Sequence, residues 1–269
     1  MKYGFIEPVL KQEDWVLSGN LDKIILQEDG QWGNFLPEVE YQKKYGIETS
    51  ACATFTSLNC LEILFNRVYN LQANFSERYN AVLGSTTPLG ASPQDVAESM
   101  RKNGVIAQKY LPFDESIETF DDFHSPTPMA EKYLEIGAEW LEYNSIFHDW
   151  VVIPSDKDKP KQLMEALKTS PLLVSVKAWR QEGEYYVKTK GDRDNHATTL
   201  YGYVEGEYWK IFDSYDNVHK KLAWDYDFGW AKRFVLAKKV AENEQQALVE
   251  RLVDMLITFW RTLRSMLGF

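Results

Sequence analysis

The sequence predicts an α+β fold with two lobes and an appended amphipathic helix at its C-terminal end. From about residue 50 to 72, apolar residues recur at the three- and four-residue spacing of a helix. Segments rich in Val, Tyr, Ile and Phe, separated by Gly and Asp, follow between 171 and 238, as in a series of short strands. An apolar stripe with charged residues on its other faces runs through 241–269. Helices thus come first and strands second, an order typical of α+β proteins.

The N-terminal half is expected to contain at least two helices. Thr49 or Ser50 can cap the first one, which runs to about residue 72. Ser92 can cap the second, PQDVAESMRKNG, with Pro93 at its first position and Gly104 at its end. Both helices therefore carry start signals in the sequence.

The remaining segments complete the predicted organisation. Residues 112–135 are acidic, aromatic and proline-bearing, which favours a long surface excursion, and 160–169 predict a short helix. The strand segments are PLLVSVKAW, EGEYYVKTK, HATTLYGYV, YWKIFDSYD and KRFVLAKK. We expect an extended lead-in, a mainly helical lobe, a mainly β lobe and a final helix, with the bounds 1–37, 38–155, 156–240 and 241–269.

Composition excludes several classes of function. The formal net charge is −10 over 269 residues, without a basic stripe, so we expect no nucleic-acid partner. The first residues, MKYGFIEPVLKQEDW, lack the apolar core of a secretory signal, and no stretch reaches the roughly 18–20 apolar residues of a membrane span. No spacing of Cys, His or Asp predicts a metal site, and no Gly-rich phosphate loop is present, so we expect no cofactor. The compartment stays open between cytoplasmic and virion-associated.

The chain contains two cysteines, Cys52 and Cys60. In a helix, eight residues span roughly 12 Å, whereas a disulfide needs Cα atoms within about 7 Å, so we expect no bridge between them. Cys60 lies among leucines and is expected in the core. Cys52 lies at the predicted helix start, where unpaired N–H groups and the helix dipole favour a thiolate, which makes it a candidate nucleophile.

A candidate general base lies downstream. His196, one of four histidines, opens the probable core strand in DNHATTLYGYV, 144 residues after Cys52, and about 130–150 residues separate Cys from His in one class of thiol peptidase. Asp213 ends the next strand, 17 residues after His196. A hairpin of the two strands would bring Asp213 close enough to orient the imidazole.

Three segments in this order resemble the boxes of papain-like cysteine peptidases. SACATFTS resembles Gly-Ser-Cys-Trp-Ala-Phe-Ser, NHATTLYGY resembles Asn-His-Ala-Val-x-x-x-Gly-Tyr, and YWKIFDSYD resembles Tyr-Trp-x-x-Lys-Asn-Ser-Trp, within a similarity that covers about 38–238. The resemblance implies a helical lobe packed on an antiparallel β-barrel-like lobe. It also implies hydrolysis of peptide or isopeptide bonds through a thioester, with Cys52 as nucleophile, His196 as base and Asp213 as the orienting group.

Several positions depart from the family pattern. The usual Asn of the third box is Asp213, and the Trp that shields the His–Asn bond is Tyr215. The oxyanion-hole Gln, six residues before the nucleophile, is replaced by Gly46. The nearest glutamine is Gln42, ten residues before the cysteine, so it would have to reach the site to join the backbone N–H of Cys52. A further departure is Glu48, whose carboxylate close to the thiol would raise the thiol pKa.

These departures leave a second function open. A papain-fold structural or adaptor protein, with weak or no catalysis, would be anchored by its helix at 241–269. That helix could pair with copies of itself, bind an assembly partner, dock on its own domain or lie on a membrane surface. The stretch before Cys52 is too short for the family's helical pro-domain, and the compact pattern is loosely similar to phage-encoded members. A role as a bacteriophage virion or tail component is therefore the alternative to a peptidase.

Overall fold

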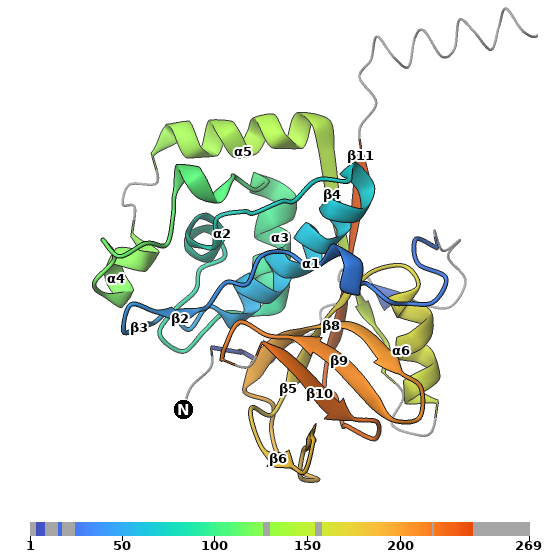
Figure 1. The fold of residues 1–269 in the computed structure, drawn as a ribbon. Coiled ribbons are helices and arrows are strands. Elements are labelled where there is room, and N and C mark those ends of the chain that lie inside the picture. Colours follow the sequence, from blue (N-terminus) through green and yellow to red (C-terminus); the bar gives the residue numbers. More distant parts are fainter. Residues whose placement is uncertain are drawn as a thin grey trace, which may run out of the picture.

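A computed structural model describes residues 4–8, 16–17, 25–125, 130–153, 158–216 and 218–238. The helix predicted at 241–269 lies outside these residues. One part of the molecule is helical and the other is a sheet, and helix α1 runs between them (Figure 1). The described residues thus form the mixed α+β architecture that the sequence predicts.

The helical part is built around α1, which extends over Cys52–Tyr69 and is buried along most of its length. It begins after Ala51 rather than with a Thr49 or Ser50 cap, because both hydroxyls are used elsewhere. Thr49 Oγ1 donates to the carbonyl of Gln42 at 2.8 Å, and Ser50 Oγ donates to the carbonyl of Pro88 at 3.1 Å. The predicted caps instead fasten the loop that leads into the helix.

Helix α3 agrees with the sequence prediction, whereas the helices that begin within 112–135 were not predicted. Ser92 Oγ accepts a hydrogen bond from the Gln94 N–H at 3.2 Å and caps α3, which ends at Gly104 as predicted. The excursion predicted over 112–135 was wrong in part, since this stretch contains one short helix and the start of another. The further helices are α2 (Glu77–Leu83), α3 (Pro93–Asn103), α4 (Phe120–His124), α5 (Glu131–Tyr143) and α6 (Lys159–Leu167).

The sheet has nine described strands in the order β1-β4-β11-β5-β8-β9-β10-β7-β6. Every pair of neighbours in the run β4-β11-β5-β8-β9-β10 is antiparallel. A separate hairpin joins β2 to β3. The strands are β1 (Val16–Leu17), β2 (Lys43–Lys44), β3 (Ile47–Glu48), β4 (Asn144–Val151), β5 (Leu172–Val176), β6 (Gln181–Glu182), β7 (Tyr185–Tyr186), β8 (His196–Val204), β9 (Tyr208–Phe212), β10 (His219–Ala223) and β11 (Ala231–Lys238).

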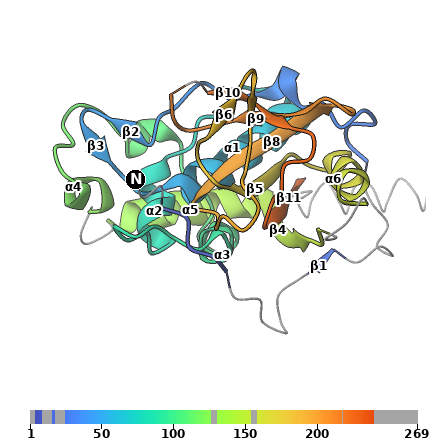
Figure 2. The same cartoon turned by 90° about the horizontal axis from the view of Figure 1, so that it is seen from below.

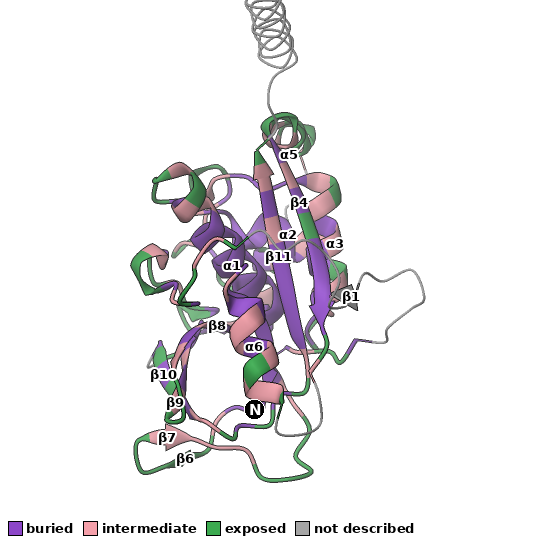
Figure 3. Cartoon of the chain, turned by 90° about the vertical axis from the view of Figure 1, so that its right-hand side faces the viewer, coloured by how far each residue is buried: buried purple, intermediate pink, exposed green. Residues whose placement is uncertain are grey.

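Strand β4 has no counterpart among the predicted strands, although it pairs with β11 along its whole length. Its sequence, NSIFHDWV, places polar residues at buried positions, which obscures the alternation expected of a strand. Asp149 is tolerated there because the Arg233 guanidinium binds it with two bonds of 3.0 and 2.5 Å. Figure 3 shows both strands buried along most of their length.

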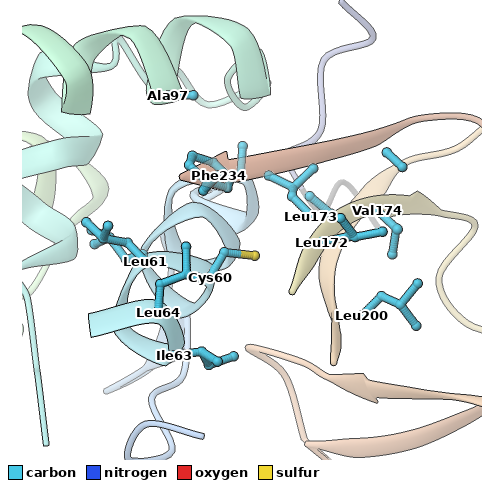
Figure 4. Close-up of a cluster of buried hydrophobic side chains, with 14 of the residues drawn as sticks. Cys60, Leu61, Ile63, Leu64, Ala97, Leu172, Leu173, Val174, Leu200 and Phe234 are labelled. Atoms are coloured by element: carbon cyan, nitrogen blue, oxygen red, sulfur yellow. The ribbon is translucent and has the colours of Figure 1, made fainter. Parts of the chain in front are cut away.

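The main core lies between α1 and the sheet. Figure 4 shows Cys60 in this core near Leu61, Leu64 and Phe234. Cys60 is fully buried and both cysteines are free thiols, which confirms Cys60 as a core residue and the absence of a bridge. Packing of α1 onto β8 brings the first residue of the helix, Cys52, next to the first residues of the strand. Among the described helices, none has the length and apolar character needed to cross a membrane.

Candidate active site

Cys52 is the first residue of α1 and its side chain is fully buried. Burial raises the pKa of its thiol, the backbone N–H groups of Ala197 and Ala53 lower it, and the charges of Asp213 and Glu48 raise it. The hydrogen bond from Ala197 places the sulfur beside the residue that follows His196. The structure therefore brings the predicted nucleophile to the start of β8 in its protonated form.

His196 and Asp213 meet across the β8–β9 hairpin. The Nε2 atom of His196 lies 2.6 Å from Oδ1 of Asp213, and both side chains are fully buried. Burial alone would raise the pKa of Asp213, but the His196 and Lys220 partners outweigh it and the net shift is downward. Asp213 is hence a carboxylate that only accepts, so Nε2 of His196 donates its hydrogen and Nδ1 is the ring nitrogen left for the proton of a nucleophile.

Lys220 on β10 is a member of this cluster that the sequence reasoning missed. Its Nζ donates to Oδ2 of Asp213 at 2.7 Å and to the carbonyl of Asp216 at 2.7 Å, with only 2% of the side chain exposed. The signal was present in the sequence HKKLA, since Lys220 shares the inward-facing parity of Leu222. An ammonium in a core-facing strand position is costly unless it is paired and hydrogen-bonded, and Asp213 supplies both for Lys220.

Two aromatic rings pack edge-on against the His196 imidazole. The Tyr215 ring centroid lies 5.5 Å away with an interplanar angle of 79°, and the Trp179 centroid lies 5.6 Å away at 80°. Tyr215 is at the position predicted to shield the histidine, whereas Trp179 comes from the loop after β5 and was not predicted. Rings around the His–Asp bond exclude water, which strengthens that hydrogen bond.

Gln42 reaches this cluster through the β2–β3 hairpin. The hairpin accommodates the extra residues between Gln42 and Cys52, and Gln42 is fully buried. The backbone N–H of Gln42 donates to the carbonyl of Ser214 at 3.0 Å, and Ser214 Oγ donates to Gln42 Oε1 at 2.9 Å. The glutamine is thus fixed beside the residues that follow Asp213 despite its unusual spacing.

A carboxylate lies on the donor side of that amide. Glu48 Oε1 accepts hydrogen bonds from Gln42 Nε2 and from the Ser50 N–H, each at 3.0 Å, and Glu48 Oε2 accepts from the Tyr215 hydroxyl. The proximity of Glu48 to Cys52 that the sequence suggested is reflected in its contribution to the raised thiol pKa. In this conformation the amide donor of Gln42 is directed at Glu48.

The described N-terminal residues pass close to the start of α1. Ala91 N–H donates to the Gly4 carbonyl at 2.9 Å and Ile6 N–H donates to the Ala91 carbonyl at 3.2 Å. Gly4 has a φ of +92° and a Cβ there would lie 2.0 Å from the carbonyl oxygen of Ser50, so only glycine fits. The segment 4–8 thus packs, through Gly4, against Ser50 in the loop that leads into α1 and Cys52.

Comparison with solved structures finds proteins of similar fold. Xylellain, a cysteine protease from Xylella fastidiosa, matches with a TM-score of 0.58 and 18% identity, covering 90% of this chain and 97% of that one. Digestive procathepsin L 3 from the larval midgut of Tenebrio molitor matches with a TM-score of 0.56 and 13% identity, covering 82% of this chain and 73% of that one. The chain has a papain-like cysteine-peptidase fold. Bromelain from Ananas comosus matches this papain-like chain with a TM-score of 0.53 and 16% identity, covering 78% of this chain and 98% of that one.

The likeness is one of fold rather than of sequence. No family model matches the papain-like chain, and no curated protein matches it. Within the described residues, no group of three or more His, Cys, Asp or Glu side chains could hold a metal ion. The chemistry available to the site is therefore argued below from its own thiol, imidazole, carboxylates and amides.

Proposed function

We propose that the protein is a papain-like cysteine hydrolase that cleaves peptide or isopeptide bonds. The observation that carries this proposal is the buried hydrogen bond of His196 Nε2 to Asp213, which assigns proton acceptance to Nδ1, in a cluster where the next residue, Ala197, donates its N–H to the Cys52 thiol. A thiol at a helix start, an oriented imidazole and a carboxylate partner are the parts required for nucleophilic catalysis of acyl transfer. The fold of the structural neighbours supports the same general chemistry.

The reaction would begin with proton transfer, because burial keeps the Cys52 thiol protonated. His196 Nδ1 takes the thiol proton as the sulfur attacks the carbonyl carbon of the scissile amide. The tetrahedral intermediate collapses, its C–N bond breaks, and the imidazolium returns the proton to the leaving amine. Water then attacks the thioester with His196 as base, releasing the acid and restoring the thiol. Asp213 keeps the ring oriented throughout and stabilises the imidazolium.

The oxyanion would be stabilised by the backbone N–H of Cys52 and the side-chain amide of Gln42. Gln42 Nε2 donates to Glu48 Oε1 at 3.0 Å and to the Tyr215 hydroxyl at 3.4 Å in this conformation, so both amide hydrogens are engaged and Gln42 can serve once one of these partners moves away. Loss of one oxyanion donor costs about 10²–10³ in rate in a serine peptidase. The resting arrangement is therefore expected to hydrolyse amide bonds slowly until the Gln42 amide is released.

Thiol labelling tests the proposal without knowledge of the substrate. The intact protein is treated with a small thiol-directed electrophile, and the rate and position of the adduct are measured by mass spectrometry. Fast labelling of Cys52 that falls about 10²-fold or more in His196→Ala is expected, because a general base contributes on that scale. Labelling of Cys52 no faster than that of a free model thiol would contradict the proposal.

Two controls separate the reaction from nonspecific effects. Cys60 is equally buried but lies in the core, so its labelling reports opening of the fold alone. His219→Ala changes an exposed histidine on β10, and this variant is expected to label like the unchanged protein. A loss of labelling in His219→Ala as large as that in His196→Ala would show that the effect is not local to His196.

A structural or adaptor role is the second candidate, and one observation favours it. Cys52 and His196 are both fully buried, as expected of a site that has lost access to substrate. In this case Cys52 would label as slowly as Cys60, and His196→Ala would change the free energy of unfolding without changing the labelling. Anchoring through 241–269 and a virion-associated role belong to this candidate.

A further inference from the structure

The third member of the proposed site is a charged pair rather than a single residue. Asp213 receives the His196 ring on Oδ1 and the Lys220 ammonium on Oδ2, and the backbone N–H of Ser214 also donates to Oδ1 at 3.0 Å. Both charged side chains are excluded from solvent, at 0% and 2% exposure. A buried carboxylate that faces an imidazole is therefore neutralised from its other oxygen.

The chemical consequence concerns the base. A lone carboxylate beside a buried imidazole stabilises the imidazolium, which strengthens His196 as a base but makes the imidazolium a weaker acid when it must return the proton to the leaving amine. The Asp213–Lys220 pair has no net charge, yet Oδ1 still accepts the Nε2 hydrogen. To His196 the pair thus resembles a neutral amide acceptor, which is the chemistry of the asparagine usual at this place in the resembled family.

We propose that Lys220 is a positioning residue of the active site, which balances the charge of Asp213 so that His196 can gain and lose a proton during catalysis. The ammonium is itself held in place by the Asp216 carbonyl at 2.7 Å and lies 5.0 Å from the centroid of the Trp179 ring. Trp179 in turn packs on His196. Lys220 acts through Asp213 and touches neither thiol nor substrate. This inference rests on the proposed hydrolase function.

Other ionisable groups surround the same imidazole and must stay constant in a test. Tyr215 packs on the imidazole from the loop after β9, its hydroxyl donates to Glu48 of β3, and the Cys52 thiol of α1 accepts from the Ala197 N–H. Asp194, two residues before His196, is paired with the Lys188 ammonium at 2.6 Å. All of these side chains are present in every variant. Because the Asp213 charge also raises the pKa of the Cys52 thiol directly, the His196 midpoint is the measurement that reports the charge balance.

The experiment compares three variants of the full chain: Lys220→Met, Asp213→Asn and the double variant. The titration midpoint of His196 is measured by NMR, and the pH profile of Cys52 labelling is measured in parallel. Lys220→Met leaves the carboxylate uncompensated, so the midpoint is expected to rise by about one pH unit. Asp213→Asn leaves the ammonium uncompensated, so the midpoint is expected to fall by a similar amount. The double variant is expected to return close to the unchanged protein in both measurements.

Lys232→Met is the matched control for removal of a buried ammonium. Lys232 on β11 is fully buried, donates to Gln94 Oε1 at 2.6 Å and lies 3.9 Å from the Trp150 ring centroid. Its substitution removes comparable packing and charge away from the site, so the His196 midpoint is expected to stay unchanged. A purely structural role for Lys220 predicts the same unchanged midpoint for Lys220→Met.

The outcomes are distinguishable. Equal midpoints in all variants, or single-variant shifts in the same direction, overturn the charge-balancing role even if Cys52 of the unchanged protein labels rapidly. Slow Cys52 labelling in the unchanged protein overturns the hydrolase function and this inference with it. If Lys220→Met alone does not fold, comparison of Asp213→Asn with the double variant decides, because adding Lys220→Met to that background must raise the midpoint.

Discussion

At the scale of single residues, Glu48 acts on two groups that the proposed reaction needs. Its carboxylate accepts the Gln42 amide hydrogen and contributes to the raised pKa of the Cys52 thiol, where burial is the largest cause. The Tyr215 hydroxyl and the Ser50 N–H hold it in place. A negative charge in this position opposes both the thiolate and the oxyanion, since each is negative.

Replacement of Glu48 by Gln is expected to increase the labelling rate of Cys52 at neutral pH. The substitution removes the opposing charge while the side-chain oxygen can still accept from the Ser50 N–H. A rise of about tenfold is expected, which corresponds to one pKa unit of the thiol. The rate is measured with the same electrophile over a range of pH.

The control for this variant is Glu38→Gln, which removes an exposed carboxylate from the same N-terminal stretch. It is expected to leave the rate unchanged. A Glu48→Gln variant that labels at the original rate or more slowly would show that the carboxylate does not restrain the thiol.

At the scale of elements, helices α1 and α2 carry carboxyl groups into the interior. Glu62 of α1 is 2% exposed and Glu77 of α2 is 3% exposed. Burial and the charge of Glu40 raise the pKa of Glu62 well above its usual value, although the Phe75 N–H at 2.7 Å lowers it. Burial and the interaction with Glu40 likewise raise the pKa of Glu77. The folded state is therefore more stable when these two carboxyl groups are protonated.

The free energy of unfolding should therefore depend on pH through Glu62. Below its unfolded pKa the carboxyl is protonated in both states and no penalty arises. Above it the unfolded chain ionises while the folded chain resists, so stability falls as pH rises toward the folded pKa. Glu62→Gln is expected to raise the free energy of unfolding near pH 7.5 by about 1–3 kcal/mol, with little change near pH 4, as measured by chemical denaturation at both pH values.

Glu139→Gln provides a comparison, because Glu139 is exposed on α5. Its stability is expected to follow that of the unchanged protein at both pH values. The interpretation of Glu62 fails if Glu62→Gln destabilises the protein at pH 7.5, since that result requires an ionised, well-paired carboxylate.

The elements that sequence predicts well are those whose signals are local. Ser92 and Gly104 define the ends of α3, and β8 and β9 show strand composition between turn residues. Strand β4 was missed because its buried Asp149 is stabilised by Arg233, more than 80 positions away in sequence. Lys220 was missed for the same reason, since its partner becomes visible only when β9 and β10 pair. A charge pair between distant segments cannot be predicted from the residue pattern of either segment alone.

At the scale of the whole molecule, the structure describes part of the N-terminal segment, residues 4–8, but not the C-terminal residues 241–269. The function of 241–269 stays a prediction, as those residues lie outside the described ones. Residues 4–8 are described and pair with Ala91, while Trp230 Nε1 donates to Glu7 Oε1 at 3.4 Å. Gly4 and Gly90 approach so closely that a Cβ on Gly90 would lie 1.7 Å from the Gly4 carbonyl oxygen. This segment thus connects the loop before α1 to the loop before α3.

Removal of residues 1–8 is expected to expose the loop that precedes Cys52 and to speed labelling of the Cys52 thiol. Two backbone hydrogen bonds contribute about 1–3 kcal/mol together, so the rate should rise roughly tenfold if the segment must leave before the electrophile enters. Gly4→Val, which clashes with the Ser50 carbonyl, should act in the same direction. Ile6→Ala, at an exposed side chain, is the control, and unchanged labelling in the truncated protein would show that the segment does not limit access.

The arrangement of the site along the chain also determines when it forms during folding. His196 on β8, Asp213 directly after β9 and Lys220 on β10 lie within 25 residues of the sequence, on three successive antiparallel strands and their connections. This meander can therefore assemble from local contacts. Cys52 is 144 residues earlier and meets the base only when α1 docks on β8. If Cys52 and His196 act as proposed, the nucleophile and its base are separate until late in folding, and a newly made or partly unfolded chain would carry no assembled catalyst that could cleave it or its neighbours.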